Sequence, residues 1–256
     1  MATGFVGQIF NSIQGEGLYA GRRQVFVRFA GCSLDCVYCD TDGFRQFKLP
    51  KCEIETSPSS GKLNTELNPM THAAVIGHLR RLVTPDIHSV SLTGGEPLQA
   101  GDFLLDIARD CKREGLATYL ETNGSNSNAM RKIVQYTDFA AIDIKLPEHH
   151  AVPAHTWPSL LREELSCVKL SLENEVDTFV KVVVLPRTSE KIVAGVCKKL
   201  VKIGKVPLVL QPVYPARMIK RFPSMTHVYH IAQSAAKAGI NEIAIIPQIN
   251  KLIGVF

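Results

Sequence analysis

Short apolar runs alternate with amphipathic segments along most of the chain. The runs are rich in Val, Ile, Leu and Phe and are too short for helices, so they predict buried strands. These predicted strands cover residues 24–30, 88–94, 117–123, 139–146, 179–185, 207–213 and 242–247. Amphipathic helices are predicted between several of them, at 71–83, 102–115 and 189–204. Because strands and helices alternate at this spacing, we expect right-handed βαβ units and a parallel sheet.

Residues at the ends of the predicted helices agree with this pattern. Thr71 is a suitable N-cap, and Gly115 and Gly204 are typical helix ends. Roughly six or seven βα units fit either a doubly wound sheet or a full or partial barrel, and the hydrophobic pattern does not choose between them. Residues 43–70 are polar and have no sustained period, so they predict a long loop inserted in a single domain that spans 1–256.

Charge and composition exclude several classes of protein. The net charge of +5 comes from 29 basic and 24 acidic residues that are scattered, which favours a solvated surface over a nucleic-acid groove. No apolar run approaches the roughly 20 residues of a membrane helix, and the N-terminus lacks the features of a signal peptide. We therefore expect a cytoplasmic protein without direct contact with nucleic acid or membrane.

Three of the seven cysteines lie close together in a Cys-x3-Cys-x2-Cys pattern, at Cys32, Cys36 and Cys39. They directly follow a predicted strand, and active sites of parallel α/β folds gather at such strand ends. Thiolates at this spacing suit an iron–sulfur cluster. A structural zinc site needs four ligands, and Cys52 is a possible fourth, but no paired cysteine or histidine accompanies it. Three cysteines leave one iron of a four-iron cluster open to a chelating small molecule.

The remaining four cysteines do not form a disulfide framework, because the chain shows no secretion signal. Cys111 and Cys197 lie among apolar residues in helical patterns, and we expect them in the core.

The segment SLTGGEPL, residues 91–98, follows the next predicted strand. Gly94 and Gly95 permit close backbone approach to a ligand, and Glu96 supplies an acceptor. Arg28 lies in an apolar strand, where a buried guanidinium needs an acceptor. That acceptor is either a carboxylate on another strand or a substrate carboxylate bound through two hydrogen bonds.

Polar pairs also lie on two further strands. Glu121 and Asn123 share one strand face, as do Asp143 and Lys145. Four polar side chains near the ends of two buried strands suit a binding site, although a structural network would use the same residues.

The cysteine spacing, with Tyr38 before the last cysteine, resembles the radical S-adenosylmethionine (SAM) superfamily. Within it, the whole chain resembles the 7-carboxy-7-deazaguanine synthases. The motifs that carry this resemblance are Gln14-Gly15-Glu16-Gly17, Cys39-Asp40-Thr41, Thr93-Gly94-Gly95-Glu96-Pro97, Glu121-Thr122-Asn123-Gly124, Asp143-Ile144-Lys145 and the tail PQINKLIGVF.

The resemblance implies a modified, partial (β/α) barrel of about six βα units and a homodimer. It implies a lyase with a 4Fe-4S cluster, SAM and Mg2+, reduced by an electron donor such as flavodoxin or ferredoxin. The implied reaction is a radical ring contraction of 6-carboxy-5,6,7,8-tetrahydropterin to 7-carboxy-7-deazaguanine. Ammonia is released, and the product feeds queuosine or archaeosine in tRNA.

The resemblance also assigns roles to individual residues. Cys32, Cys36 and Cys39 would hold the cluster, and Thr41 would ligate Mg2+. SAM would contact Tyr38, Cys39, Asp40, Gly94, Gly95, Glu96, Asp143, Ile144, Lys145, Lys181, Val182, Val183 and Val184. The pterin would contact Ile13, Gln14, Gly15, Glu16, Arg28, Thr93 and Phe256, the last through the C-terminal carboxylate.

Two departures affect what the resemblance implies: Asn250 stands where the family commonly has histidine, and the 43–70 loop is longer than in compact members, so no role is carried over to it. Two other functions compete. A glycyl-radical activase would share the cysteines and the Gly-Gly-Glu-Pro motif, but has no need of Gln14 to Gly17 together with Arg28. A non-catalytic zinc protein would use Cys52 with the cysteine triplet.

Overall fold

The computed structural model describes residues 2–254. Its centre is a curved ten-stranded sheet in the order β12-β11-β10-β9-β8-β7-β3-β2-β4-β5. Seven neighbouring strands are parallel. They are β3 (Arg23–Phe29), β7 (Ser89–Gly94), β8 (Thr118–Thr122), β9 (Phe139–Asp143), β10 (Asp177–Val184), β11 (Leu208–Pro212) and β12 (Ile243–Ile245). All seven predicted strands are therefore present.

A helix follows each of the first six parallel strands along the chain. They are α1 (His72–Leu82), α2 (Asp102–Arg113), α3 (Ser127–Ile133), α4 (Trp157–Glu173), α5 (Glu190–Ile203) and α6 (Met225–Lys237), and a short α7 (Ile249–Ile253) ends the described chain. Each parallel strand except β12 is followed by one of α1 to α6, which makes six βα units.

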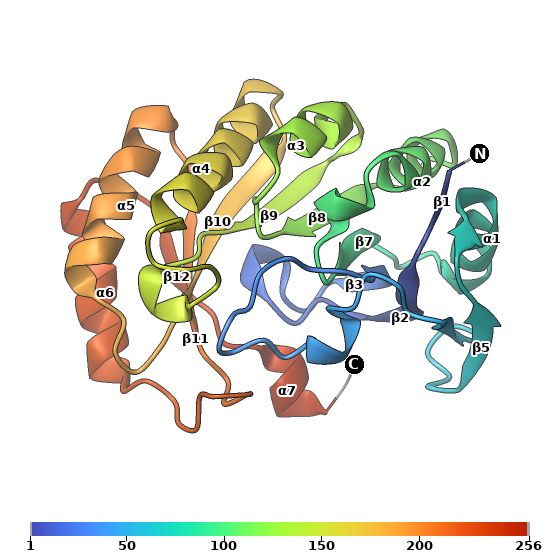
Figure 1. Ribbon diagram of the computed structural model, residues 1–256, viewed down its shortest axis with the longest axis horizontal. Helices are drawn as coiled ribbons and strands as arrows, with labels where there is room; N and C mark the ends of the chain where they lie inside the picture. The colour runs from blue at the N-terminus through green and yellow to red at the C-terminus, as the bar shows by residue number, and fades with distance from the viewer. Residues whose placement is uncertain (1, 255–256) are drawn as a thin grey trace.

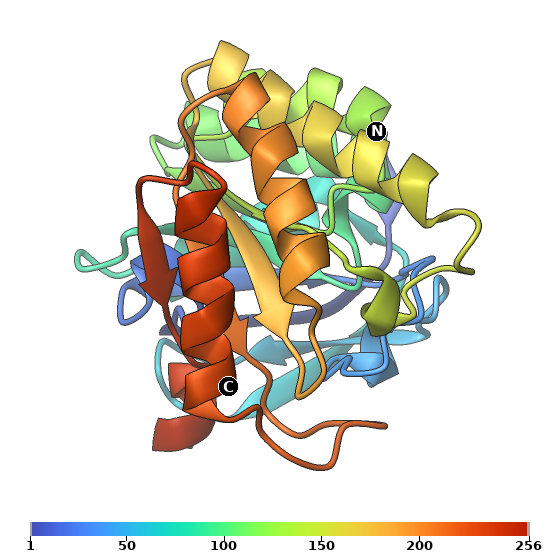
Figure 2. The same cartoon turned by 90° about the vertical axis from the view of Figure 1, so that its left-hand side faces the viewer.

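The six long helices lie along one side of the sheet (Figure 1), and α4, α5 and α6 lie next to one another across it (Figure 2). A doubly wound sheet would carry helices on both faces, so the structure confirms the partial barrel.

Local sequence explains how individual helices begin and end. The Thr71 hydroxyl accepts a hydrogen bond from the Ala74 amide (3.2 Å), which caps α1 as predicted. Gly115 follows α2 with a φ of +70°, in the left-handed region that favours glycine. Gly204 follows α5 in extended backbone, so this glycine ends the helix without the left-handed turn.

The prediction of a long loop at 43–70 was wrong for much of that segment. It contains β4 (Lys51–Glu55) and β5 (Leu63–Leu67), an antiparallel hairpin that extends the sheet beyond β2, and the start of β6 (Met70–Thr71). The hairpin was hidden because β5 has a mostly exposed, polar sequence at the edge of the sheet. Only the short run Cys52 to Ile54 in β4 alternates between buried and exposed side chains.

The N-terminal strands were also not predicted. Strand β2 (Val6–Ile13) pairs antiparallel with β3, and the two-residue β1 (Thr3–Gly4) pairs with β6. Buried polar side chains obscure the apolar pattern of β2. Asn11, for example, is 5% exposed and its side chain donates to the Leu82 carbonyl (2.9 Å).

The main core lies between the sheet and the helices, where the strands contribute Val, Ile, Leu and Phe side chains. Cys111 and Cys197 are buried in this core, as predicted. Cys52 belongs to the same core with no exposed surface. Within residues 2–254, no helix combines the length and the apolar character needed to cross a membrane.

Candidate active site

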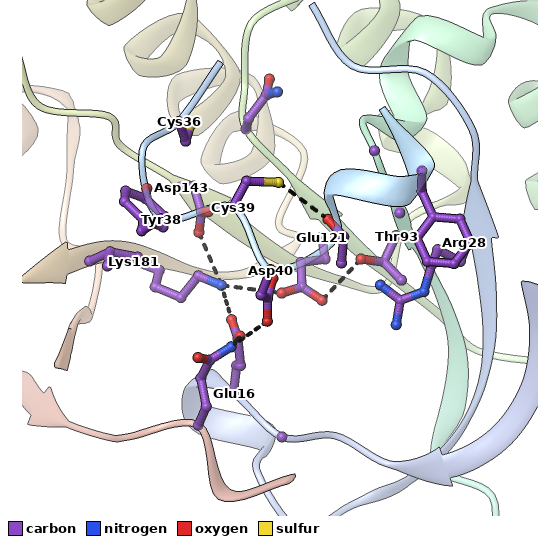
Figure 3. A pocket seen from close by; sticks show the side chains of 18 of the residues that line it. Glu16, Arg28, Cys36, Tyr38, Cys39, Asp40, Thr93, Glu121, Asp143 and Lys181 are labelled. Carbon is purple, nitrogen blue, oxygen red and sulfur yellow. Dashed lines mark hydrogen bonds and ion pairs between the residues drawn. The ribbon is translucent and has the colours of Figure 1, made fainter. Parts of the chain in front are cut away.

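A cavity of about 510 Å³ opens at the carboxyl ends of the parallel strands. Each of six successive strands contributes a polar side chain to its wall. These side chains are Arg28, Thr93, Glu121, Asp143, Lys181 and Gln211, and several of them converge in Figure 3. Because carboxyl ends of parallel strands meet at one edge of a sheet, residues far apart in the sequence line the same space.

The cysteine loop forms one wall of this cavity, and all three of its thiols line it. Neighbouring segments fix the loop through backbone hydrogen bonds. Val37 N–H donates to the His149 carbonyl (3.0 Å), and Cys32 N–H donates to the Arg45 carbonyl (3.1 Å). Cys52 lies outside the cavity lining, in the core of the sheet. The structure therefore separates Cys52 from the triplet, which removes the fourth ligand of the zinc alternative.

The environment of the three thiols fits an iron–sulfur cluster. Burial raises the pKa of Cys32 to about 11 and also raises the pKa of Cys36, so a bound cation is needed to make these groups thiolates at neutral pH. Within residues 2–254, no three His, Cys, Asp or Glu side chains are arranged around the position of one metal ion.

Lys181 is the centre of a buried charge cluster on the opposite side of the cavity from Arg28 (Figure 3). Its ammonium pairs with Glu16, with Glu121 Oε1 (3.2 Å) and with Asp143 Oδ1 (3.2 Å). Burial alone would lower the pKa of Lys181, but the three carboxylates raise it well above its ordinary value. The lysine therefore stays charged, with a side chain that is only 5% exposed.

A second buried cation lies beside the cysteine loop. Lys145 Nζ pairs with Asp143 Oδ2 (2.6 Å) and donates to the Tyr38 hydroxyl (3.3 Å). Burial opposes the charge of Lys145, but Asp143 and Tyr38 raise its pKa well above the ordinary value. The Tyr38 ring packs edge-on against His149, with ring centroids 4.9 Å apart. His149 is fully buried, and burial with the nearby Lys145 lowers its pKa to about 3, so it is neutral.

Arg28 forms no ion pair with any residue of the described chain, and its Nε atom is buried without a partner there. The guanidinium lies over the rings of Phe10 (5.6 Å) and Phe44 (5.3 Å). Burial lowers its pKa, and the more distant carboxylates of Asp40 and Glu121 oppose this shift. Of the two acceptors predicted for Arg28, the interstrand carboxylate is not seen, and the guanidinium faces the cavity.

The Gln14 to Gly17 segment forms a third wall and is held by the end of the described chain. Gln248 Nε2 donates to Glu16 and to Asp40 Oδ2 (3.0 Å), and Ile249 N–H donates to the Gly15 carbonyl (2.9 Å). A Cβ atom on Gly15 would lie 2.2 Å from Asn250 Oδ1, so the glycine lets the two segments pack. Asn250 lines the cavity with its Oδ1 buried and unpaired within residues 2–254. Phe256 lies outside the described residues.

The Gly-Gly-Glu motif has a structural use that its sequence did not indicate. A Cβ on Gly94 would lie 2.3 Å from the Phe29 backbone, and one on Gly95 would lie 2.3 Å from the Gly31 carbonyl oxygen. The glycines therefore let this turn pack against the chain leading into the cysteine loop, as well as lining the cavity.

Glu96 joins the ends of two strands. Its carboxylate accepts hydrogen bonds from Leu98 N–H (3.0 Å), Thr122 Oγ1–H (2.6 Å) and Asn123 N–H (2.7 Å). Burial raises its pKa to about 7, although these hydrogen bonds oppose the rise. Much of its acceptor capacity is therefore used within the protein.

The structure brings most of the predicted site residues to the cavity. Those that line it are Ile13, Gln14, Gly15, Glu16, Arg28, Cys32, Cys36, Tyr38, Cys39, Asp40, Thr41, Thr93, Gly94, Gly95, Glu96, Asp143, Lys145, Lys181 and Val183. Three do not: the side chains of Ile144, Val182 and Val184 lie in the main core. Side chains alternate along a strand, so Lys181 and Val183 face the cavity while Val182 and Val184 face the helices.

Several residues that line the cavity were not predicted from the sequence. Gln211 is 4% exposed and lines the cavity, and its Oε1 has no hydrogen-bond partner among the described residues. Because Gln211 is a polar residue inside the apolar run 207–213, the sequence could have indicated that it lines a site. Gln248 and Tyr214 also line the cavity; Gln248 lies in the tail motif PQINKLIGVF but was given no role, and no local pattern marks Tyr214.

Comparison with known proteins agrees with this geometry. Residues 26–200 match the Radical SAM superfamily. The 7-carboxy-7-deazaguanine synthase of Methanocaldococcus jannaschii is 37% identical over 96% of this chain and 98% of its own length. The Geobacter sulfurreducens protein of the same name is 33% identical, with 96% of each chain covered.

Solved structures show the same fold at lower identity. QueE from Escherichia coli aligns with a TM-score of 0.56 at 19% identity, covering 95% of this chain and 93% of that one. A radical SAM methyltransferase from Sphaerobacter thermophilus aligns with a TM-score of 0.62 at 15% identity, covering 88% and 66% of the two chains.

Proposed function

The chain belongs to the radical SAM superfamily and, within it, to the 7-carboxy-7-deazaguanine synthase family, and from this premise we propose how the cavity is used. Its substrate is 6-carboxy-5,6,7,8-tetrahydropterin, which is converted to 7-carboxy-7-deazaguanine with release of ammonia. The observation that carries this proposal is Arg28, a half-buried cation without an ion-pair partner among residues 2–254, in the same cavity as the cysteine triplet. A substrate with a carboxylate supplies the partner that the described chain does not.

Cys32, Cys36 and Cys39 would hold a 4Fe-4S cluster, whose fourth iron is left for the amino and carboxylate groups of SAM. When bound, the cluster and SAM supply the carbon radical that begins the reaction. Lys145 lies in the wall behind Cys36, where its positive charge favours the thiolate forms of the ligands. Tyr38 and Asp40 flank the last ligand, so the loop that holds the cluster also forms part of the SAM site.

The substrate would lie between Arg28 and the Gln14 to Gly17 segment. Arg28 binds its carboxylate through two N–H groups, and Glu16 accepts N–H groups of the aminopyrimidine edge. Lys181 and Gln248 hold the Glu16 carboxylate in place through the contacts described above. Thr93, whose hydroxyl donates to Glu121 Oε2 (3.3 Å), faces another edge of the ring.

Proton transfer falls to the titratable groups of this cavity. Asn250 replaces the histidine common in the family, and an amide neither gives nor takes a proton at neutral pH. Asn250 can therefore bind the substrate, and proton transfer would fall to carboxyl groups that line the cavity, among them Glu16 and Glu121. The unpaired Oδ1 of Asn250 offers an acceptor beside Gly15.

A magnesium ion would bind at Thr41, whose hydroxyl is a suitable oxygen ligand. Thr41 lines the cavity, and its Oγ1 lies 3.7 Å from Cys39 Sγ. One hydroxyl is an incomplete coordination shell, and Mg2+ commonly keeps several waters and uses substrate oxygens. We therefore expect Mg2+ to bind together with the substrate rather than before it.

The wider setting follows from the same premise. The enzyme would act as a homodimer in the cytoplasm, take electrons from a flavodoxin or ferredoxin, and deliver its product toward queuosine or archaeosine. It would not bind nucleic acid itself.

The role of Arg28 is tested by equilibrium binding to anaerobically reconstituted enzyme. A charged hydrogen bond contributes about 1.5–3 kcal/mol, so Arg28→Ala should weaken carboxypterin binding by roughly 10- to 100-fold or more while SAM affinity is unchanged. Arg22→Ala, which removes an exposed arginine just before the same strand, is the matched control. If Arg28→Ala weakens SAM binding and leaves carboxypterin binding intact, the substrate assignment is wrong.

A further inference from the structure

The segment between β11 and α6 projects from the molecule beside the cysteine loop (Figures 1 and 2). We propose that its outer side, the 214–222 surface, is the docking site for an acidic electron-transfer protein that reduces the cluster. This surface consists of Tyr214, Arg217, Met218, Lys220, Arg221 and Phe222. The inference rests on the proposed function, because it requires a cluster on the cysteine triplet.

The 214–222 surface is attached directly to the loop that carries the cluster ligands. Met218 N–H donates to the Val37 carbonyl (3.0 Å), and Arg217 Nη1 donates to the Cys36 carbonyl (2.8 Å). Ile219 packs on the small core formed by Val37 and its neighbours. A protein that contacts Met218 therefore lies one hydrogen bond and one residue away from a cluster ligand, which provides a short path for an electron.

Apolar side chains on this surface are not covered by the described chain. Met218 is 70% exposed, Phe222 55% and Tyr214 37%. Tyr214 and Phe222 pack edge-on with ring centroids 5.3 Å apart, so they present one connected apolar area. Small interfaces with an apolar centre suit the weak, transient complexes of electron-transfer proteins.

The charges around this centre are basic. Arg217 is balanced by Asp35 (2.9 Å) and Asp42 (3.6 Å). Lys220 and Arg221 are exposed, and neither forms an ion pair within residues 2–254. Two unbalanced cations beside an apolar centre attract an acidic partner and accelerate its association at low salt.

The same charges argue against a second copy of this chain on the surface. A twofold interface would bring two copies of the same patch together, so Lys220 and Arg221 of one copy would lie against a surface with the same excess of positive charge. Like charges brought together in this way cost free energy. We therefore assign the surface to an acidic redox partner and not to self-association.

The test uses anaerobically reconstituted enzyme and a purified flavodoxin reduced to its hydroquinone. In each encounter the reduced flavin loses one electron and the cluster gains it, passing from the 2+ to the 1+ state. Stopped-flow absorbance and electron paramagnetic resonance follow the reduced cluster. Lys220→Glu with Arg221→Glu should slow reduction by flavodoxin at least tenfold at low salt and weaken its salt dependence, while dithionite reduces the cluster as before. The matched control is Lys198→Glu with Lys199→Glu, an exposed basic pair on α5.

Three results would overturn the proposal: an unchanged rate with flavodoxin, an equal loss of rate with dithionite, or a change of oligomeric state in the double variant. The second would show that the segment supports the cysteine loop, and the third would assign the surface to another copy. Met218→Ser provides an independent check, because it should slow reduction of the cluster by flavodoxin without changing the charge of the surface. Failure of the proposed function would look different, since the cluster would be absent or would form and be reduced without yielding the deazaguanine.

Discussion

Replacement of Lys181 by methionine tests the role of the buried charge cluster. Methionine keeps much of the length of the side chain but removes the ammonium, which leaves Glu16, Glu121 and Asp143 facing one another in the cavity wall. Within residues 2–254, Glu16 and Glu121 form ion pairs with Lys181 alone, whereas Asp143 also pairs with Lys145; the Lys181 side chain is 5% exposed, so water screens these charges poorly. The variant should fold less stably and lose the alignment of Glu16.

The magnitude follows from the geometry. Removing one partner of a buried ion pair costs about 3–5 kcal/mol, and 1 kcal/mol shifts the melting temperature of a chain of this size by about 2–4 °C. We therefore expect a fall of roughly 6–20 °C. Burial raises the pKa of Glu16 above its ordinary value even with Lys181 present, and loss of the ammonium, which opposes this shift, raises it further. The stability of the variant is then lost as pH rises, so its deficit should be larger near about pH 8 than near about pH 5.

The assay is thermal unfolding at a fixed scan rate, followed by circular dichroism under anaerobic conditions. Lys198→Met, which removes an exposed lysine of α5, serves as the control and should change the melting temperature little. Adding Glu121→Gln to Lys181→Met removes one of the unbalanced charges and should restore part of the loss. A deficit of less than about 1 kcal/mol, or one that grows as the pH falls, would refute the reasoning.

Other variants test separate parts of the site. Cys36→Ala should abolish the cluster and activity, whereas Cys52→Ala should retain both, as measured by iron content and absorbance. Loss of the cluster in Cys52→Ala would contradict a cluster that is held by three cysteines and has one iron open to SAM. The folded pKa of Glu96 is raised to about 7 from 4.5, so this group contributes stability at low pH that is lost as the pH rises through that interval. The difference in unfolding free energy between the wild-type protein and Glu96→Gln should therefore fall by roughly 3 kcal/mol between pH 4.5 and about pH 7. A difference that does not change with pH would contradict the raised pKa of Glu96. Gln211→Leu removes an unpaired buried oxygen, so it should stabilise the ligand-free protein by about 1–3 kcal/mol and reduce the thermal shift caused by SAM; an unchanged SAM shift would place Gln211 outside that site.

The sequence predicted the parallel part of the fold because most of its strands are buried on both faces. Such strands read as continuous apolar runs, and all seven were found. Strand β5 is exposed along most of its length and lies at the edge of the sheet, so its polar residues resembled a loop. Strand β2 contains buried polar residues, including Asn11, whose hydrogen bonds are made by distant segments.

The site was predictable where its residues lie within a motif. The cysteine triplet, Glu16 and Arg28 carry recognisable neighbours in sequence, and the cavity contains all of them. Contacts between distant segments were not predictable. Gln248 bonds Glu16 across 232 positions, and only the folded chain brings them together. Because side chains alternate along a strand, the sequence could have predicted that Val182 and Val184 point into the core. The roles assigned from the family resemblance did not distinguish contacts made by side chains from contacts made by the backbone.

The central claim is that this cavity contracts the ring of a carboxylated pterin. The most direct test incubates anaerobically reduced, reconstituted enzyme with SAM, Mg2+ and 6-carboxy-5,6,7,8-tetrahydropterin, and follows the products by mass spectrometry. We predict 7-carboxy-7-deazaguanine and one equivalent of ammonia for each pterin consumed. Cleavage of SAM without any 7-carboxy-7-deazaguanine would contradict the account.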